Sequence, residues 1–268
     1  MIKVTKGKEP QVLIDNKAQW TSDLVALVKK YGSYESIPKN EKSDAIKNYA
    51  HPDITAALLG RGGKAKCIYC ESYVDITGYA NIEHYHPKSL YPNETFSWDN
   101  LFVGCALCNT PKNNFDTSRK PFIHPVNDNP EDYLTFDELN YVPKFTSGTA
   151  YEKAKNLIEA CKLEERTALV REHANVLCAF LDTRNMIVAK ITHYNGIKSE
   201  KSKILDAMGL LKSLMVLNDE ASDDAHFAGY MRYLLRKYVE VKDAVAIVNS
   251  HKDDLGIPGG FQWSFSFI

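Results

Sequence analysis

The chain has 268 residues and a formal net charge of −1, with 44% hydrophobic and 25% charged residues. This is the composition of an ordinary globular protein, and the length is sufficient for a hydrophobic core without covalent staples. Between residues 61 and 125, seven Lys/Arg stand against six Asp/Glu. The balanced charge excludes a polybasic nucleic-acid binder, so any contact with nucleic acid must come from a local patch or from a partner.

The N-terminus shows no apolar segment of a signal peptide, and no run of about 18 apolar residues predicts a membrane span. We therefore expect a cytoplasmic protein. Four of the six cysteines form two Cys-x-x-Cys pairs, which in a cytoplasmic chain favours metal binding over disulfides. The other two, Cys161 and Cys178, lie in helical patterns and are expected to be buried as small hydrophobic residues.

The spacing of apolar residues predicts helices in the N-terminal segment, residues 1–63. The first helix is expected at 19–31, after a short strand or flexible lead-in at 12–14. Shorter helices are expected near 40–49 and 53–59, before a glycine-rich break. We expect this segment to pack on the module that follows.

Residues 64–148 are expected to form a small α+β module with a strand at 82–85, a second strand leading into Cys105 and a helix at 109–115. A further strand pair is expected around Phe136 and Tyr141.

Residues 149–268 are expected to form a helical domain that ends in an aromatic tail, 261–268, with the alternation of an edge strand. The sequence thus predicts an α+β, mostly helical fold in three segments.

The two Cys-x-x-Cys pairs are Cys67 with Cys70 and Cys105 with Cys108. Each pair can present two sulfurs to one ion, and four thiolates make a closed tetrahedral zinc site. The 34 residues between the pairs exceed the roughly 15–20 of a zinc ribbon, which predicts an inserted hairpin. Because a closed site has no open coordination position, we expect a structural zinc.

The catalytic residues are expected in the stretch spanned by the two cysteine pairs. They are Glu83 and His84, between the pairs, and Asn109, directly after Cys108. A histidine with a pKa near 6.5 can accept a proton from water at neutral pH. Carboxylate and amide oxygens are hard ligands suited to Mg²⁺, which can stabilise the charge that develops on a phosphodiester during cleavage.

Three motifs stand out between residues 83 and 112: Glu83-His84-Tyr85-His86-Pro87-Lys88-Ser89, Asp99-Asn100-Leu101 and Cys105-x-x-Cys108-Asn109-x-x-Lys112. Together they resemble the HNH endonuclease family with its ββα-metal finger, over about residues 64–125. The resemblance implies divalent-metal-dependent cleavage of DNA or RNA, with Mg²⁺ or Mn²⁺ as the catalytic ion. DNA is the expected substrate.

The resemblance implies a role for four residues. His84 falls on the general base and Glu83 on the acidic metal ligand before it. Asn100 falls on the central Asn, which ties the loop to the base, and Asn109 falls on the last metal-binding position. The sequence departs from the common pattern in having Glu in place of Asp at 83 and Asn in place of His at 109.

A narrower resemblance covers residues 120–130, residues 226–232 and the helical C-terminal half. These parts are similar to the PtuB-type HNH effectors of Septu and retron anti-phage systems. This resemblance implies an SMC/ABC-like ATPase partner of the PtuA type.

Four basic residues are expected to contact nucleic acid: His86, Lys88, Lys112 and Arg119. His86 could instead face solvent from its strand, and scattered cations such as Lys112, Arg119 and Lys120 are also typical of a solvated face.

Two alternatives to the nuclease remain open at this point. The first is a catalytically inactive, zinc-stabilised module that binds nucleic acid or protein. The second is a zinc hydrolase using His84 and His86, for which the sequence shows no third protein ligand.

Overall fold

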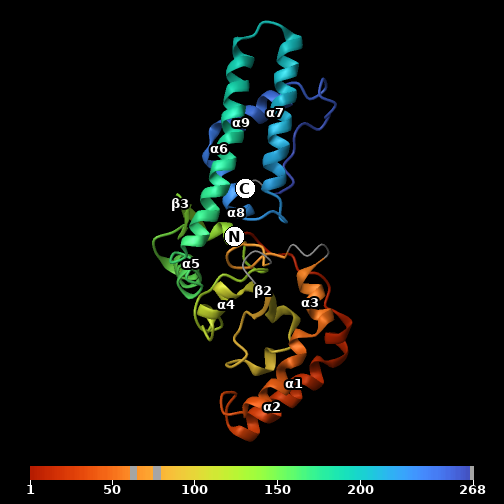
Figure 1. The fold of residues 1–268 in the computed structure, drawn as a ribbon, viewed down its shortest axis with the longest axis vertical. Helices are drawn as coiled ribbons and strands as arrows, with labels where there is room; N and C mark the ends of the chain where they lie inside the picture. Colours follow the sequence, from red (N-terminus) through yellow and green to blue (C-terminus); the bar gives the residue numbers. More distant parts are fainter. Residues whose placement is uncertain (61–64, 75–79, 266–268) are drawn as a thin grey trace. The chain divides into compact units, whose positions relative to one another are not determined.

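The computed structural model describes residues 1–60, 65–74 and 80–265. The chain divides into two compact units, unit 1 (Met1–Arg166) and unit 2 (Thr167–Ile268). Helices dominate, with two small antiparallel sheets (Figure 1), so the predicted α+β, mostly helical fold is confirmed. The expected boundary between residues 63 and 64 lies outside the described residues, and the division into three segments stays a prediction.

Unit 1 begins with helices that include the stretch expected to be a strand or lead-in. That expectation was wrong, because α1 starts directly after Pro10, whose φ of −69° suits a helix start, and buries Leu13. Gly32, at φ 81°, ends the helix in the left-handed region. The elements are α1 (Gln11–Tyr31), α2 (Lys39–Ile46), the 3₁₀ turn η1 (Lys47–Ala50) and α3 (Pro52–Leu59).

The N-terminal helices share a hydrophobic core with the segment that follows strand β1 (Ala80–His84). This core joins α1 and α3 to residues of the loop and of strand β2 (Leu101–Cys105). Its packing fixes the loop that contains the 3₁₀ turns η2 (Pro92–Glu94) and η3 (Trp98–Asn100). The buried members are Leu13, Leu24, Tyr34, Ile37, Ile54, Phe96, Trp98 and Leu101.

The predicted hairpin is formed by β1 (Ala80–His84), which pairs antiparallel with β2 and places Glu83 opposite Phe102. Helix α4 (Ala106–Lys112) follows β2 without a loop. We had expected this helix at 109–115. It starts earlier because Cys105 is already its extended N-cap, and it ends where Asn113 takes a φ of 40°.

The rest of unit 1 contains the expected second strand pair, in which Phe136 faces Tyr141, and one long helix. The elements are η4 (Pro130–Asp132), β3 (Leu134–Asp137), β4 (Asn140–Pro143) and α5 (Gly148–Ala160).

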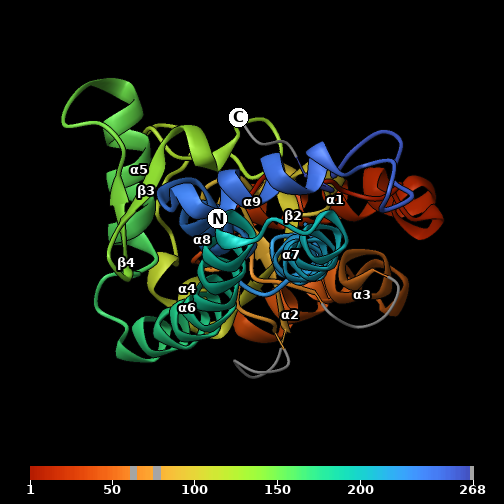
Figure 2. The same cartoon turned by 90° about the horizontal axis from the view of Figure 1, so that it is seen from above.

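Unit 2 is helical, with α6 (Thr167–Gly196), α7 (Glu200–Glu220), α8 (Ala228–Lys237) and α9 (Val239–Ser250). Helices α6 and α7 form a long antiparallel hairpin, and α9 lies across both of them (Figure 2). Residues 261–265 form no strand, contrary to expectation, and the last three residues of the tail lie outside the described part. Among the helices of the described ranges, none has the length and apolar character to cross a bilayer.

Candidate active site and metal centre

The four cysteines of the two pairs converge on one point. Their sulfurs lie within 4.8 Å of one another, and all four residues are buried. Sulfurs at the corners of a tetrahedron, each about 2.3 Å from a central zinc, would stand about 3.8 Å apart. Cys70 Sγ and Cys105 Sγ lie 3.8 Å apart. The donor set and its spacing therefore fit the predicted four-thiolate zinc site.

The surroundings of the cluster suit an anionic metal centre. Four thiolates around Zn²⁺ carry a net charge of about −2, and Arg166 Nη1 donates to Cys108 Sγ at 2.9 Å. The turn that contains Cys67 and Cys70 is connected to β2 by the Ile68 N–H, which donates to the Val103 carbonyl oxygen at 3.1 Å. The cluster thus connects the Cys67–Cys70 turn, the end of β2 and α4.

The two remaining cysteines differ in their surroundings. Cys161 is fully buried beside Cys108, as expected for a small apolar residue. Cys178 is exposed on α6, so the expectation that it is buried was wrong. The helical pattern places Cys178 on a face of α6 that the rest of unit 2 leaves uncovered.

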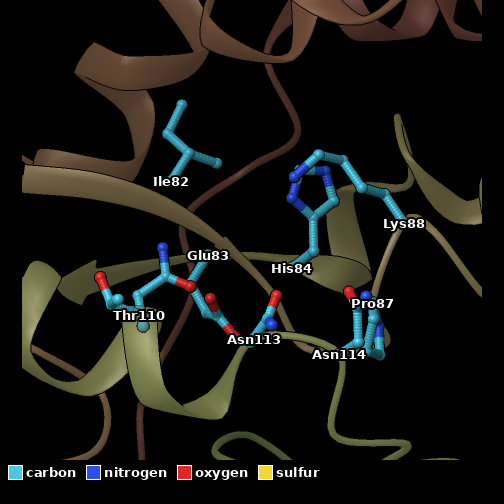
Figure 3. A pocket seen from close by; sticks show the side chains of 9 residues that line it. Ile82, Glu83, His84, Pro87, Lys88, Thr110, Asn113 and Asn114 are labelled. Atoms are coloured by element: carbon cyan, nitrogen blue, oxygen red, sulfur yellow. The ribbon is translucent and has the colours of Figure 1, made fainter. Parts of the chain in front are cut away.

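A cavity of about 340 Å³ opens at the end of β1, between the hairpin and α4 (Figure 3). It brings together three of the four residues to which the sequence assigns catalytic roles. The lining residues are Ile82, Glu83, His84, Pro87, Lys88, Asn109, Thr110, Asn113 and Asn114.

Glu83 is anchored by buried donors. The Tyr69 hydroxyl donates to Glu83 Oε1 at 3.0 Å, and Lys112 Nζ lies 2.5 Å from the same oxygen. Burial raises the pKa of Glu83, and the opposing effects of Lys112 and Tyr69 favour the carboxylate. The side chain is therefore held in one position at the edge of the cavity.

His84, the next residue on the strand, is directed away from Glu83, and the Lys88 side chain runs alongside its ring (Figure 3). His84 Nε2 lies 3.0 Å from the Thr95 carbonyl oxygen. Because a carbonyl can only accept, Nε2 carries the hydrogen and Nδ1 keeps its lone pair. The Tyr49 ring packs edge-on against the imidazole at 4.9 Å.

The imidazole of His84 is neutral. Burial lowers its pKa to about 3, and the positive charges of Lys88 and Lys112 act in the same direction. A phosphate drawn to Lys88 would offset part of this effect and make the imidazole a stronger base.

Asn100 is buried and is not among the residues that line the cavity; its side chain closes the loop between the strands. Its Oδ1 accepts from the His86 N–H at 2.7 Å, and its Nδ2 donates to the carbonyls of His86 and Glu94 at 3.0 and 3.2 Å. Glu94 precedes Thr95, the residue that holds His84. The geometry agrees with the tying role that the resemblance implies, and the role itself stays a prediction.

Replacing Asn100 with alanine is expected to reduce the turnover of any catalysed cleavage by roughly tenfold or more, because the Thr95 carbonyl loses its support and a 1 Å misplacement is costly. Unfolding free energy should fall by about 1–3 kcal/mol, since buried backbone groups lose partners. Nicking kinetics and chemical denaturation measure both effects. The exposed Asn93 on the same loop gives the control Asn93→Ala, and equal loss in both variants would contradict the prediction.

The residues at the cavity fit a divalent metal ion. Glu83 offers a carboxylate and Asn109 an amide, both hard oxygen donors. They lie on neighbouring elements with Gly104 between them: a Cβ added at Gly104 would stand 3.2 Å from Glu83 Cβ and 3.8 Å from Asn109 Cβ. A glycine at this position allows β1 and α4, which carry Glu83 and Asn109, to approach.

The four basic residues expected to contact nucleic acid have different surroundings. Lys88 lines the cavity, and Arg119 is exposed. His86 Nδ1 pairs with Glu94 Oε2 at 2.7 Å. Lys112 is buried, with a side chain 1% exposed and its ammonium paired with Glu83, which contradicts the expected contact of Lys112 with nucleic acid. Contacts by the other three stay predictions.

The sequence did not reveal the residues that hold the catalytic candidates in place. Tyr69, Tyr49 and Thr95 act through a hydroxyl, a ring and a main-chain carbonyl, and none of these belongs to a motif. Lys112 carried one usable signal, because it follows Asn109 by three residues, and residues at that spacing are neighbours on a helix.

Comparisons with known proteins agree with this geometry. Residues 67–115 match the family model of the HNH endonuclease. The chain is 25% identical over 196 residues to a Septu protein PtuB from Bacillus thuringiensis, covering 73% of this chain and 67% of the relative. It is 26% identical over 255 residues to a Septu protein PtuB from Bacillus mycoides (strain KBAB4), covering 82% and 76%. Residues 67–115 thus match the HNH endonuclease family model, and the chain is similar to Septu PtuB proteins over most of its length.

Proposed function

We propose that this protein is a metal-dependent endonuclease that hydrolyses phosphodiester bonds of nucleic acid, with DNA as the expected substrate. One observation carries the proposal: Glu83, His84 and Asn109 line a single cavity at the end of β1, inside the domain that matches the HNH family. An inactive binding module would not need a fixed carboxylate, a neutral histidine and an amide around one cavity.

The contacts of the residues support a proposed role for each of them. His84 accepts the proton of the attacking water at Nδ1, because Nε2 is occupied by the Thr95 carbonyl. The water oxygen forms the new bond to phosphorus, and the ester P–O bond breaks. Lys88, at the wall of the cavity, pairs with the phosphate and so draws the scissile group toward the base.

Glu83 and Asn109 would hold one Mg²⁺ or Mn²⁺ ion. When bound, such an ion supplies charge stabilisation for the phosphoryl oxygens and the leaving oxygen. Glu83 reaches the cavity already positioned by Tyr69, so little reorganisation is needed before metal binding. The four-cysteine zinc stays outside the reaction, since its coordination is complete.

We also propose that the protein works in a bacterial anti-phage complex with an SMC/ABC-like ATPase partner and that it acts in the cytoplasm. The similarity to two Septu PtuB proteins supports the complex. A nuclease in a living cell must be restrained, and an ATPase that controls access to the cavity could provide the restraint.

Cleavage is expected to require added Mg²⁺ or Mn²⁺ and to stop in EDTA, because the proposed ligands are two oxygens without tight thiolate binding. The test is nicking of supercoiled plasmid, with single-stranded DNA and RNA as alternative substrates. Each should be tried with the chain alone and co-purified with its ATPase. Binding without cleavage in every condition would refute the nuclease and favour the inactive binding module.

A further inference from the structure

Lys112 is the most deeply buried charged group at the candidate metal site, with a side chain 1% exposed. Its Nζ lies 2.5 Å from Glu83 Oε1 and donates to the His84 carbonyl oxygen at 3.0 Å. A lysine is almost never buried without a partner, because its ammonium group loses strong hydration. Lys112 therefore owes its position to the two residues of β1 that carry the proposed chemistry.

The same contacts connect the two halves of the site. Lys112 belongs to α4, one turn after the proposed ligand Asn109, and its partners lie on β1. A cation inside this frame neutralises Glu83 before any metal ion arrives. Tyr69 donates to the same carboxylate oxygen, so Glu83 is held by two donors at one oxygen.

We propose that Lys112 is a built-in counter-cation of the catalytic metal site. It keeps Glu83 and the end of β1 in place without divalent metal, and its charge weakens the affinity of the site for that metal. This inference rests on the proposed function, in which Glu83 is a metal ligand.

The sign of the effect follows from electrostatics. A divalent ion on Glu83 would share the carboxylate with the Lys112 ammonium, which lies 2.5 Å from Oε1. Two positive charges bound to one carboxylate repel each other even with an effective dielectric constant near 20. Lys88 also stands near Glu83, but it lines the open cavity, where a substrate phosphate can pair with it. The ammonium group of Lys112 is buried and cannot pair with a substrate phosphate, so its charge repels a metal ion on Glu83 with or without substrate.

The test compares Lys112→Gln with wild type and with Lys120→Gln, which removes the same charge from an exposed position. In the zinc-loaded full chain, Lys112→Gln should bind Mn²⁺ roughly tenfold tighter or more, measured by calorimetry and by electron paramagnetic resonance. In buffer without free divalent metal, its melting temperature should fall below that of wild type, and added Mn²⁺ should raise it more than that of wild type. Lys112→Arg, which keeps the charge, should retain wild-type affinity, and Lys120→Gln should change neither quantity.

Unchanged or weaker Mn²⁺ binding by Lys112→Gln, with wild type binding normally, overturns the inference and leaves the proposed function intact. The variant Glu83→Gln distinguishes a failure of the inference about Lys112 from a failure of the proposed metal site. If wild type shows no Mn²⁺ binding that Glu83→Gln removes, the assignment of Glu83 as a ligand fails, and the inference fails with it. Folding of Lys112→Gln only with Mn²⁺ supports the inference.

If Lys112→Gln folds neither with nor without Mn²⁺, the inference is tested on the wild-type protein instead. The ¹⁵N resonance of the Lys112 ammonium, protected from exchange by burial, should shift when Mg²⁺ is added to zinc-loaded protein in buffer without other divalent metal. A resonance that does not move while Mg²⁺ binds overturns the inference.

Discussion

Replacing His84 with alanine is expected to lower the rate of phosphodiester cleavage by about 10²–10⁴-fold, the usual contribution of a general base. The imidazole is buried and neutral, with Nε2 fixed by the Thr95 carbonyl and Nδ1 free to accept a proton. Alanine removes this acceptor and leaves the Thr95 carbonyl without its donor. The measurement is the initial rate of plasmid nicking in Mg²⁺ or Mn²⁺, under the conditions in which the wild type is active.

A second variant separates catalysis from folding. His84→Gln keeps a side-chain N–H that can donate to Thr95, so it should fold more stably than His84→Ala and yet be as inactive. His193→Ala is the matched control, because His193 is 67% exposed on α6 and pairs with Asp206 of α7 within unit 2, whereas His84 belongs to unit 1. Full activity in His84→Gln would show that His84 only supports the loop, and the base would have to be sought elsewhere.

The metal centre could be predicted from the sequence because each pair of ligands lies within one short turn of the chain. A Cys-x-x-Cys turn places two sulfurs side by side wherever it occurs, and two such turns require only that the chain bring Cys67 near Cys105. The hairpin was equally visible, since a proline at 87 cannot continue a paired strand and the insertion between the pairs needs a return strand. In the structure the first strand ends earlier, at His84 opposite Leu101. The motif therefore located the cavity before any fold was known.

The residues that hold Glu83 and His84 in place could not be predicted, because their contacts join parts of the chain that are far apart in sequence. Lys112 looks like an ordinary surface cation, and only the antiparallel pairing of β1 with β2 and the direct start of α4 bury it against Glu83. Tyr49 reaches His84 because the N-terminal helices pack on the loop after β1. No spacing rule links these residues along the chain.

Substituting Cys70 with serine is expected to abolish zinc binding and to lower the melting temperature of unit 1 by about 10 °C or more. A structural zinc contributes folding free energy directly, and each kcal/mol lost shifts the melting temperature of a domain of this size by about 2–4 °C. Cys70 is one of four buried sulfurs around one point, and serine is a poor zinc ligand. The measurements are metal content by mass spectrometry and calorimetric melting.

The effect should reach the cavity because the cluster and the site share elements. Cys105 ends β2 and Cys108 lies on α4 next to Asn109, so the loss of zinc releases the frame that places Asn109 opposite Glu83. Unit 2 has its own helical core and should keep its melting transition. Cys178→Ser, an exposed cysteine on α6, removes a thiol without touching the cluster and should behave as wild type. Full zinc content in Cys70→Ser would mean that the four thiolates are not the ligand set, and Asn109 would then owe its position to packing alone.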